Sequence, residues 1–427
     1  MGRFLRAMLW PLAILAAGLW IASTEVIETH GTVAPTVQAS ALDDPKLYRT
    51  LEAITGLSRD VQHPARLVPV DAPGIAFRFR MDPRIRRGYR LARDRDGPSN
   101  PYSGTWTDVD LAIGEGPYFT VLSRVRGGTS TEVDKKSMNL RLFSSQQFTD
   151  EVRLRRFFLT NLYADPLGFE AYTCYALLER LGLFPAYRQF AVVWINDEPE
   201  GLFLLIERPE DAIRRTQPDV VSVLRRRRDD FELKYQQPDH DARASIAELQ
   251  RIHALEDDEQ QLRAYDELVD LDQYLRWRGF NSLVQNIDSL DELYWYERRA
   301  PGEARGRLGL MAWDYDDIQD ERKADDPHLH RDPLFWAAEG PLDRQILDNP
   351  LIYARYRRVL CALLTEQLTE TVLTEAVATT RELLDGIDQG FGDSVGRRLR
   401  EQRAEALAEF QRRLLERRRV LLGGAGC

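Results

Sequence analysis

The chain has 427 residues, of which 43% are hydrophobic and 10% aromatic, as is usual for a globular protein. This length predicts about two or three compact units, or one body with two lobes. The formal net charge of −10 argues against a nucleic-acid binder, whose surface is usually strongly basic. A nucleotide site remains compatible with this charge, because a few local cations and a divalent metal suffice there.

The N-terminal segment has the pattern of a secretory signal or a signal anchor. Arg3 and Arg6 precede an apolar stretch over residues 7–22, and a basic flank before such a stretch is typical of both. No Ala-x-Ala site follows, which favours an uncleaved membrane anchor over residues 1–24; a cleaved signal peptide is the alternative. We therefore expect a membrane-anchored or secreted protein that lies outside the cytoplasm, in the periplasm or cell envelope.

After this segment the pattern predicts a linker over residues 25–45 and a sheet-rich N-lobe over residues 46–210. Alternating apolar and polar residues, bounded by Gly, Pro, Asn and Asp, predict its strands. The expected elements are strands over 74–80, 108–113, 118–125, 137–142, 190–195 and 201–207, a helix over 166–183 and a hairpin turn at 196–200.

Residues 211–427 predict a mainly helical C-lobe. A run of four arginines at 225–228 is followed by Asp229 and Asp230, so a solvated surface of mixed charge is favoured over an anion-binding patch. The order of elements predicts a bilobal α+β fold. Apolar spacing predicts helices over 270–285, 352–366, 373–387 and 394–420, and strands over 292–298 and 308–313.

The three cysteines are Cys174, Cys361 and Cys427. An odd, widely spaced set predicts neither a disulfide framework nor a zinc site. Cys174 and Cys361 lie in apolar helical patterns, so we expect buried structural thiols at both positions. The sequence assigns no role to Cys427.

A glycine-containing loop follows the third predicted strand. Residues Arg126-Gly127-Gly128-Thr129-Ser130 are followed by Lys135 and Lys136 at the start of the next strand. Small residues let backbone N–H groups approach phosphate oxygens, and a lysine on the next strand can neutralise the phosphate charge. The loop and the lysines are therefore candidates for phosphate binding; a plain turn is the alternative.

Acidic residues at three later places are candidates for the remaining chemistry. Asp288, between a helix and a strand, can hold a hydroxyl nucleophile and accept its proton, or can simply cap the turn. Asp314 and Asp316 follow an apolar strand and can supply oxygen ligands to Mg²⁺, or can form an acidic surface loop. Glu207, at a strand end, could orient a lysine or close one edge of a nucleotide pocket; a surface position is the alternative.

These candidates follow the order found in kinases, which is a glycine loop, a lysine, a loop aspartate and aspartates at a strand end. Over roughly residues 70–420 the chain resembles the spore-coat protein H (CotH) kinase-like family. The blocks that carry the resemblance are Arg126-Gly-Gly-Thr-Ser with Lys135-Lys136-Ser, the hairpin Gly201-Leu-Phe-Leu-Leu-Ile-Glu207, Asn286-Ile-Asp288-Ser289 with Tyr294-Trp-Tyr296, and Trp313-Asp-Tyr-Asp316.

The resemblance implies an atypical protein-kinase fold, ATP and Mg²⁺ as cofactors, and a protein partner as substrate. It implies that Lys135 or Lys136 contacts the phosphates, with one of them paired to an acidic residue. Asp288 would position the acceptor hydroxyl, and Asp314, or alternatively Asp316, would bind Mg²⁺. The expected function is transfer of phosphate from ATP to Ser or Thr of an envelope protein.

Three departures from the family's pattern keep an alternative open. The family's loop usually reads Arg-Gly-Asn-Ser-Ser, and Ile318-Gln319-Asp320 stands where a glycine is expected. Glu292 stands roughly where the family has asparagine, and glutamate can still bind a metal. The alternative is an inactive pseudokinase that serves as an envelope assembly or scaffold protein. A weaker alternative is a metallohydrolase that uses the acidic cluster with His328 and His330.

Overall fold

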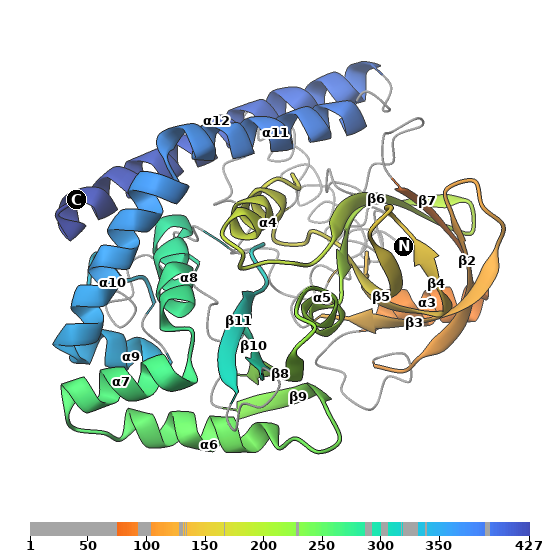
Figure 1. The fold of residues 1–427 in the computed structure, drawn as a ribbon. Coiled ribbons are helices and arrows are strands. Elements are labelled where there is room, and N and C mark those ends of the chain that lie inside the picture. Colours follow the sequence, from red (N-terminus) through yellow and green to blue (C-terminus); the bar gives the residue numbers. More distant parts are fainter. Residues whose placement is uncertain are drawn as a thin grey trace, which may run out of the picture. The chain divides into compact units, whose positions relative to one another are not determined.

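The structure, a computed structural model, describes residues 75–92, 104–127, 131, 133, 135–165, 167–227, 230–286, 293–299, 306–316, 318, 332–337, 340–388 and 393–427. All of them belong to one compact unit, Asp60–Cys427. This unit mixes helices and sheets, so the α+β class is confirmed (Figure 1). The predicted anchor at 1–24 and linker at 25–45 lie outside the described residues. Among the helices that are described, none has both the length and the apolar character needed to cross a membrane.

The predicted sheet-rich N-lobe closes into a seven-stranded barrel. Neighbouring strands run antiparallel, except that β1 and β6 are parallel. The order around the barrel is β1 (Ile75–Arg80), β2 (Thr107–Ile113), β3 (Phe119–Arg126), β4 (Ser137–Gln147), β5 (Arg153–Thr160), β7 (Glu198–Glu207) and β6 (Arg188–Ile195). The helix α3 (Pro83–Leu91) follows β1.

Side chains alternate between two cores along β5 and β7, because successive residues of a strand point to opposite faces. Phe157 and Phe203 belong to the core inside the barrel. Phe158 and Leu202, one position along, belong to a second and larger core. These two strands therefore form the wall that the barrel shares with the rest of the unit.

The expected helical C-lobe contains a four-stranded sheet, in the order β11-β10-β8-β9. Strands β10 and β11 were predicted, but β8 and β9 lie in the charged segment that was interpreted as solvated surface. For Arg226 of β8 that interpretation is wrong, since this residue is only 5% exposed. The further elements up to β11 are α4 (Glu170–Arg180), which lies between β5 and β6 in the sequence, α5 (Pro209–Thr216), β8 (Val220–Arg227), β9 (Asp230–Gln236), α6 (Ala242–His253), α7 (Asp258–Leu268), α8 (Leu271–Val284), β10 (Leu293–Arg298) and β11 (Arg307–Ala312).

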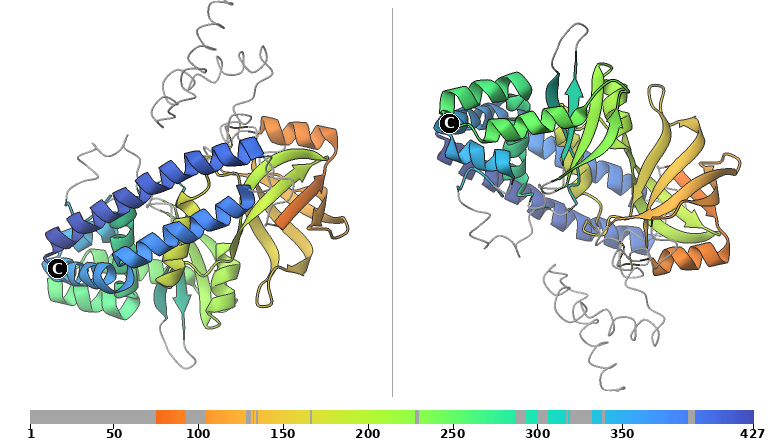
Figure 2. Two further views of the ribbon diagram at one scale, coloured as in Figure 1. Left: turned by 90° about the horizontal axis from the view of Figure 1, so that it is seen from above. Right: turned by 90° about the horizontal axis from the view of Figure 1, so that it is seen from below.

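Helices complete the C-terminal part. They are α9 (Pro341–Asp348), α10 (Pro350–Ala362), the π-helix η8 (Leu363–Gln367), α11 (Glu370–Asp388) and α12 (Asp393–Ala425). Two long helices, α11 and α12, lie side by side, as Figures 1 and 2 show. Buried Asp388 and Arg403 form an ion pair between them. The end of α12 packs against α10.

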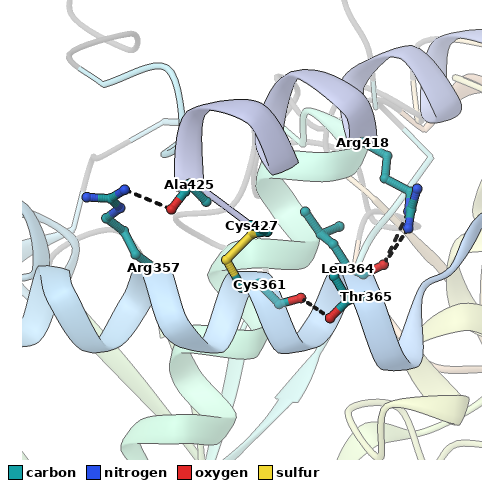
Figure 3. The surroundings of a disulfide bond; sticks show 7 residues. All are labelled: Arg357, Cys361, Leu364, Thr365, Arg418, Ala425 and Cys427. Carbon is teal, nitrogen blue, oxygen red and sulfur yellow. Dashed lines mark hydrogen bonds between the residues drawn. A yellow bond between two sulfur atoms is a disulfide. The ribbon is translucent and has the colours of Figure 1, made fainter.

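Cys361 and Cys427 form a disulfide, so the expectation of a buried free thiol at Cys361 is wrong (Figure 3). Their sequence separation of 66 gives no sign of this pairing, but α12 brings the last residue back over α10 to a Cα–Cα distance of 5.7 Å. Arg357 of α10 donates to the carbonyl oxygen of Ala425 at 2.7 Å, which is a second link between α10 and the end of α12. Cys174 is a buried free thiol, as predicted.

Candidate functional site

The first residue of the candidate site is Arg126, the last residue of β3. Gly127 follows it with φ of 111°, a conformation that side chains other than glycine's rarely adopt. The Arg126 guanidinium lies over the ring of Phe158 at 3.9 Å and near the ring of Trp313 at 6.0 Å. The glycine loop therefore begins at the wall between barrel and C-lobe. Gly128 and Ser130 lie outside the described residues.

The acidic segment after β11 alternates between buried rings and partly exposed carboxylates. Trp313 and Tyr315 are buried, whereas Asp314 and Asp316 between and after them are partly exposed. Tyr315 donates to the side-chain oxygen of Asn281 at 2.7 Å, which anchors the segment to α8. Burial of both rings thus turns both carboxylates away from the core.

Asp314 has φ of 54°, in the left-handed region. Aspartate tolerates this region better than most residues, although such positions still cost energy and often mark functional sites. The ring of the preceding Trp313 packs against Phe158 at 5.6 Å and Tyr294 at 5.9 Å. The tight turn at Asp314 is therefore held by packing immediately before it.

The described residues on either side of the Asp288 loop pair with the two ends of this acidic segment. Asn286 forms a bridge with Ile318, and Leu293 pairs with Ala312 at the start of the β10–β11 ladder. The described residues that flank the loop therefore lie beside those that flank Asp314. Asp288 and Glu292 themselves lie outside the described residues, as do His328 and His330.

Arg126 and Asp314 interact electrostatically across the wall between barrel and C-lobe. Burial lowers the pKa of the Arg126 guanidinium, and the Asp314 carboxylate is the strongest influence in the opposite direction. Two of the predicted blocks, the glycine loop and the Trp-Asp block, therefore meet in space. Their separation in sequence is 188 residues (126 to 314).

Both predicted lysines are buried at the start of β4. Lys135 donates to the main-chain oxygen of Leu202 at 2.7 Å, and Lys136 donates to the main-chain oxygen of Thr131. Lys136 and Glu200 line the same cavity of about 10 Å³, which has room for roughly one water molecule. The expected role of one lysine at the phosphates stays a prediction.

Glu207 is 2% exposed and binds Arg215 through both carboxylate oxygens, at 3.1 and 2.6 Å. One of these oxygens also accepts from the backbone N–H of Tyr187 at 3.0 Å. Glu207 lies five residues along β7 from Leu202, the partner of Lys135, or about 16 Å at the usual rise of a strand. The structure therefore places Glu207 in an arginine pair rather than beside Lys135.

Sequence reasoning missed Arg208 as part of this region, and it set aside Arg225 as part of a solvated charged run. The Arg208 guanidinium lies 5.3 Å from the centre of the Phe158 ring, the same ring that carries Arg126. Arg225, opposite Tyr294 in the β8–β10 ladder, lies 5.8 Å from the centre of the Tyr294 ring. The run of four arginines was the available signal for a cationic strand. The aspartates that follow it led to its interpretation as solvated surface.

Within the described part of the chain, no group of three or more His, Cys, Asp or Glu residues gathers in a way that could hold a metal by itself. Asp314 and Asp316 nonetheless fit Mg²⁺, which commonly takes one or two carboxylates together with phosphate oxygens and water. Their partial exposure leaves room for such additional ligands. The donor set therefore suits a metal that arrives with a nucleotide.

Comparison with known proteins identifies the family of the chain. None of the curated proteins compared matches the chain. A family model described as CotH kinase protein matches residues 123–410, a range that begins in β3 and ends within α12. This range includes Arg126, both lysines, the Asp288 loop and the acidic segment, and it covers more than half of the chain. The chain therefore belongs to the CotH kinase family.

Proposed function

We propose that the protein is an ATP- and Mg²⁺-dependent protein kinase that transfers phosphate to Ser or Thr of an envelope protein. The observation that carries this proposal is the position of Arg126, over the Phe158 ring and 6.0 Å from the ring of Trp313, the residue before Asp314. It brings a cation from the glycine loop to the acidic segment, whose flanks pair with those of the Asp288 loop. Kinases depend on this combination, because positioning and charge neutralisation supply most of the rate.

Asp314, with Asp316 as the alternative, would hold Mg²⁺, and Glu292 is a further candidate ligand. The metal ion, when bound, neutralises charge on the phosphates. Arg126 lies near Trp313, the residue before Asp314, where it would offset the same phosphate charge. Its contact with the Phe158 ring fixes the direction of the guanidinium before the nucleotide arrives.

In the proposed reaction the acceptor hydroxyl oxygen forms a bond to the γ-phosphorus of ATP. The bond between this phosphorus and the β–γ bridging oxygen breaks, and ADP leaves with that oxygen. Asp288 would accept the hydroxyl proton, the role that the family resemblance implies. The products are ADP and a phosphoserine or phosphothreonine.

The disulfide between Cys361 and Cys427 supports the proposed location outside the cytoplasm. Stable disulfides form in oxidising compartments such as the periplasm and are rare in the reducing cytosol. The basic flank and apolar stretch at residues 3–22 point to the same compartment. Envelope proteins are therefore the proposed partners.

The test uses the full chain in detergent, Mg²⁺ and ATP labelled at the γ-phosphate. Self-labelling and labelling of dephosphorylated casein are measured for the wild type, Asp288→Asn and Asp314→Asn. Each variant is expected to lose at least about 100-fold in rate, since a base and a metal ligand are removed. Asp197→Asn is the matched control for Asp314→Asn, because Asp197 is exposed and has a similar φ of 62°.

Equal labelling by the wild type and both variants would refute the mechanism. The scaffold alternative is favoured by the departures at Gly128-Thr129-Ser130 and Glu292. It predicts that the wild type neither transfers phosphate nor gains thermal stability from ATP with Mg²⁺. These two measurements therefore separate an active kinase from an inactive member of the same family.

A further inference from the structure

Three arginines lie on one group of aromatic rings beside Asp314. Arg126 and Arg208 both lie over Phe158, at 3.9 and 5.3 Å from the ring centre. Arg225 lies 5.8 Å from the centre of Tyr294. Phe158 and Tyr294 each contact the ring of Trp313, at 5.6 and 5.9 Å, edge to face. The rings thus form one continuous support for three guanidinium groups.

The three arginines come from segments that are distant in sequence. Arg126 ends β3, Arg208 stands between β7 and α5, and Arg225 lies within β8. Each of the three residues is partly exposed, whereas Tyr294 is only 3% exposed. Stacking on rings immobilises a guanidinium while leaving its N–H edges available for hydrogen bonds.

Two of these cations, Arg126 and Arg225, are close enough to repel each other. Burial is the main cause of the lowered pKa of Arg126, and the charge of Arg225 lowers it further. The nearby carboxylate of Glu210 is shared between Arg208 at 3.0 Å and Arg156 at 3.5 Å. Binding of a ligand with several negative charges would relieve this repulsion.

We infer that Arg126, Arg208 and Arg225 bind the β- and γ-phosphates of the nucleotide. The inference rests on the proposed function and assigns phosphate recognition to residues on β8 and at the end of β7. The phosphates are expected near Asp314, because a metal ion held by Asp314 would take oxygens of the same phosphates as its other ligands. Guanidinium groups suit this task, since their paired N–H groups match two phosphate oxygens at once.

The experiment measures binding of ATP, tripolyphosphate and adenosine to the full chain in detergent with Mg²⁺, by calorimetry. Arg208→Gln and Arg225→Gln are each expected to weaken ATP and tripolyphosphate binding about tenfold, the usual effect of losing a charge-assisted hydrogen bond. Adenosine affinity should not change. Arg225→Lys keeps the positive charge but loses the paired N–H groups of the guanidinium. Its affinity for ATP and tripolyphosphate should therefore lie between the affinities of the wild type and Arg225→Gln.

Arg214→Gln is the matched control, because Arg214 also stacks on a tyrosine ring, that of Tyr235 at 4.2 Å, but is exposed on α5. It should leave affinity for all three ligands unchanged. The melting temperature of each unliganded variant shows whether the protein still folds. Any Gln variant that fails to fold is replaced by the corresponding Lys variant in the comparison.

Several outcomes would overturn the inference. Wild-type affinity for ATP and tripolyphosphate in both Gln variants would do so, as would a raised KM for the acceptor protein with ATP affinity unchanged. The proposed function can fail separately: a wild type that binds tripolyphosphate through these arginines but transfers no phosphate supports the inference alone. Conversely, active phosphate transfer that is insensitive to both substitutions supports the proposed function alone.

Discussion

The guanidinium of Arg126 lies 6.0 Å from the ring of Trp313, and the carboxylate of the next residue, Asp314, raises the pKa of this guanidinium against the effect of burial. Arg126 also lies over Phe158, whose ring contacts that of Trp313, the residue before Asp314. One charge pair and one pair of rings therefore join the glycine loop to the acidic segment.

This relationship predicts a measurable coupling. In a double-mutant cycle with Arg126→Gln and Asp314→Asn, the free energy of unfolding should show an interaction of about 1 kcal/mol between the two positions. Asparagine suits position 314 because it also tolerates a positive φ, which limits side effects. Urea denaturation of the four proteins gives the coupling. Purely additive effects would contradict the pairing.

Substitution of Glu207 should affect stability rather than nucleotide binding. Glu207→Gln removes the charge that Arg215 and the Tyr187 backbone N–H rely on, at a position that is almost fully buried. We expect a loss of about 2 kcal/mol in the free energy of unfolding, less than for a fully buried pair because Arg215 is partly exposed. The affinity for ATP should stay within about twofold of the wild-type value, which is the usual experimental scatter.

The paired control for Glu207→Gln is Glu179→Gln. Glu179 also pairs with an arginine, Arg188 at 2.9 Å, but its side chain is 62% exposed. That substitution should cost under about 1 kcal/mol, as for most surface pairs. A large fall in ATP affinity for Glu207→Gln, with stability unchanged, would restore Glu207 as a nucleotide-site residue.

The disulfide should contribute strongly to stability. The double substitution Cys361→Ser and Cys427→Ser opens a loop of 66 residues, and the chain-entropy argument gives a loss of up to about 4 kcal/mol. Reduction of the wild type should cause the same loss and should not affect the double variant further. Denaturant midpoints with and without reductant measure both effects.

Thiol titration provides an independent check of the disulfide. Of the three cysteines, Cys174 is buried and the other two are bonded, so the native oxidised protein should expose no reactive thiol. Unfolding without reductant should release one thiol, and unfolding with prior reduction should release three. Three reactive thiols in the unreduced unfolded protein would show that the bond is absent.

His253 should make stability depend on pH. Burial lowers its pKa to about 4, with Arg344 acting in the same direction, whereas the unfolded value is 6.5. The unfolded chain then binds the proton more readily, so the contribution of His253 is complete above pH 6.5 and is lost as pH falls toward 4. The loss should be on the order of 1–3 kcal/mol.

Replacement of His253 by Gln should remove this contribution. The difference in unfolding free energy between wild type and His253→Gln should therefore change between pH 7 and pH 4 and level off outside about that range. Denaturant midpoints at a series of pH values measure it. A difference that is constant over the whole range would contradict the lowered pKa.

The local signals in the chain were enough to predict much of the fold. Period-two alternation located β1, β2, β3, β4, β6 and β7, and apolar spacing located the helices α4, α8, α10, α11 and α12. The same pattern did not reveal β8 and β9, because arginines that stack on Tyr294 and Trp277 look like solvated charge in a sequence. The sequence pattern also did not predict that the barrel closes, since closure depends on pairing between β1 and β6.

For the site, the sequence by itself determined the order of the blocks, and with it the family to which the chain belongs. Only the tertiary structure decided that Arg126 lies near Trp313, that Glu207 is paired with Arg215, and that Cys427 is bonded to Cys361. The physical reason is that residue type and spacing report local backbone geometry. Contacts between distant segments follow instead from how sheets and helices pack, which no short window of sequence contains.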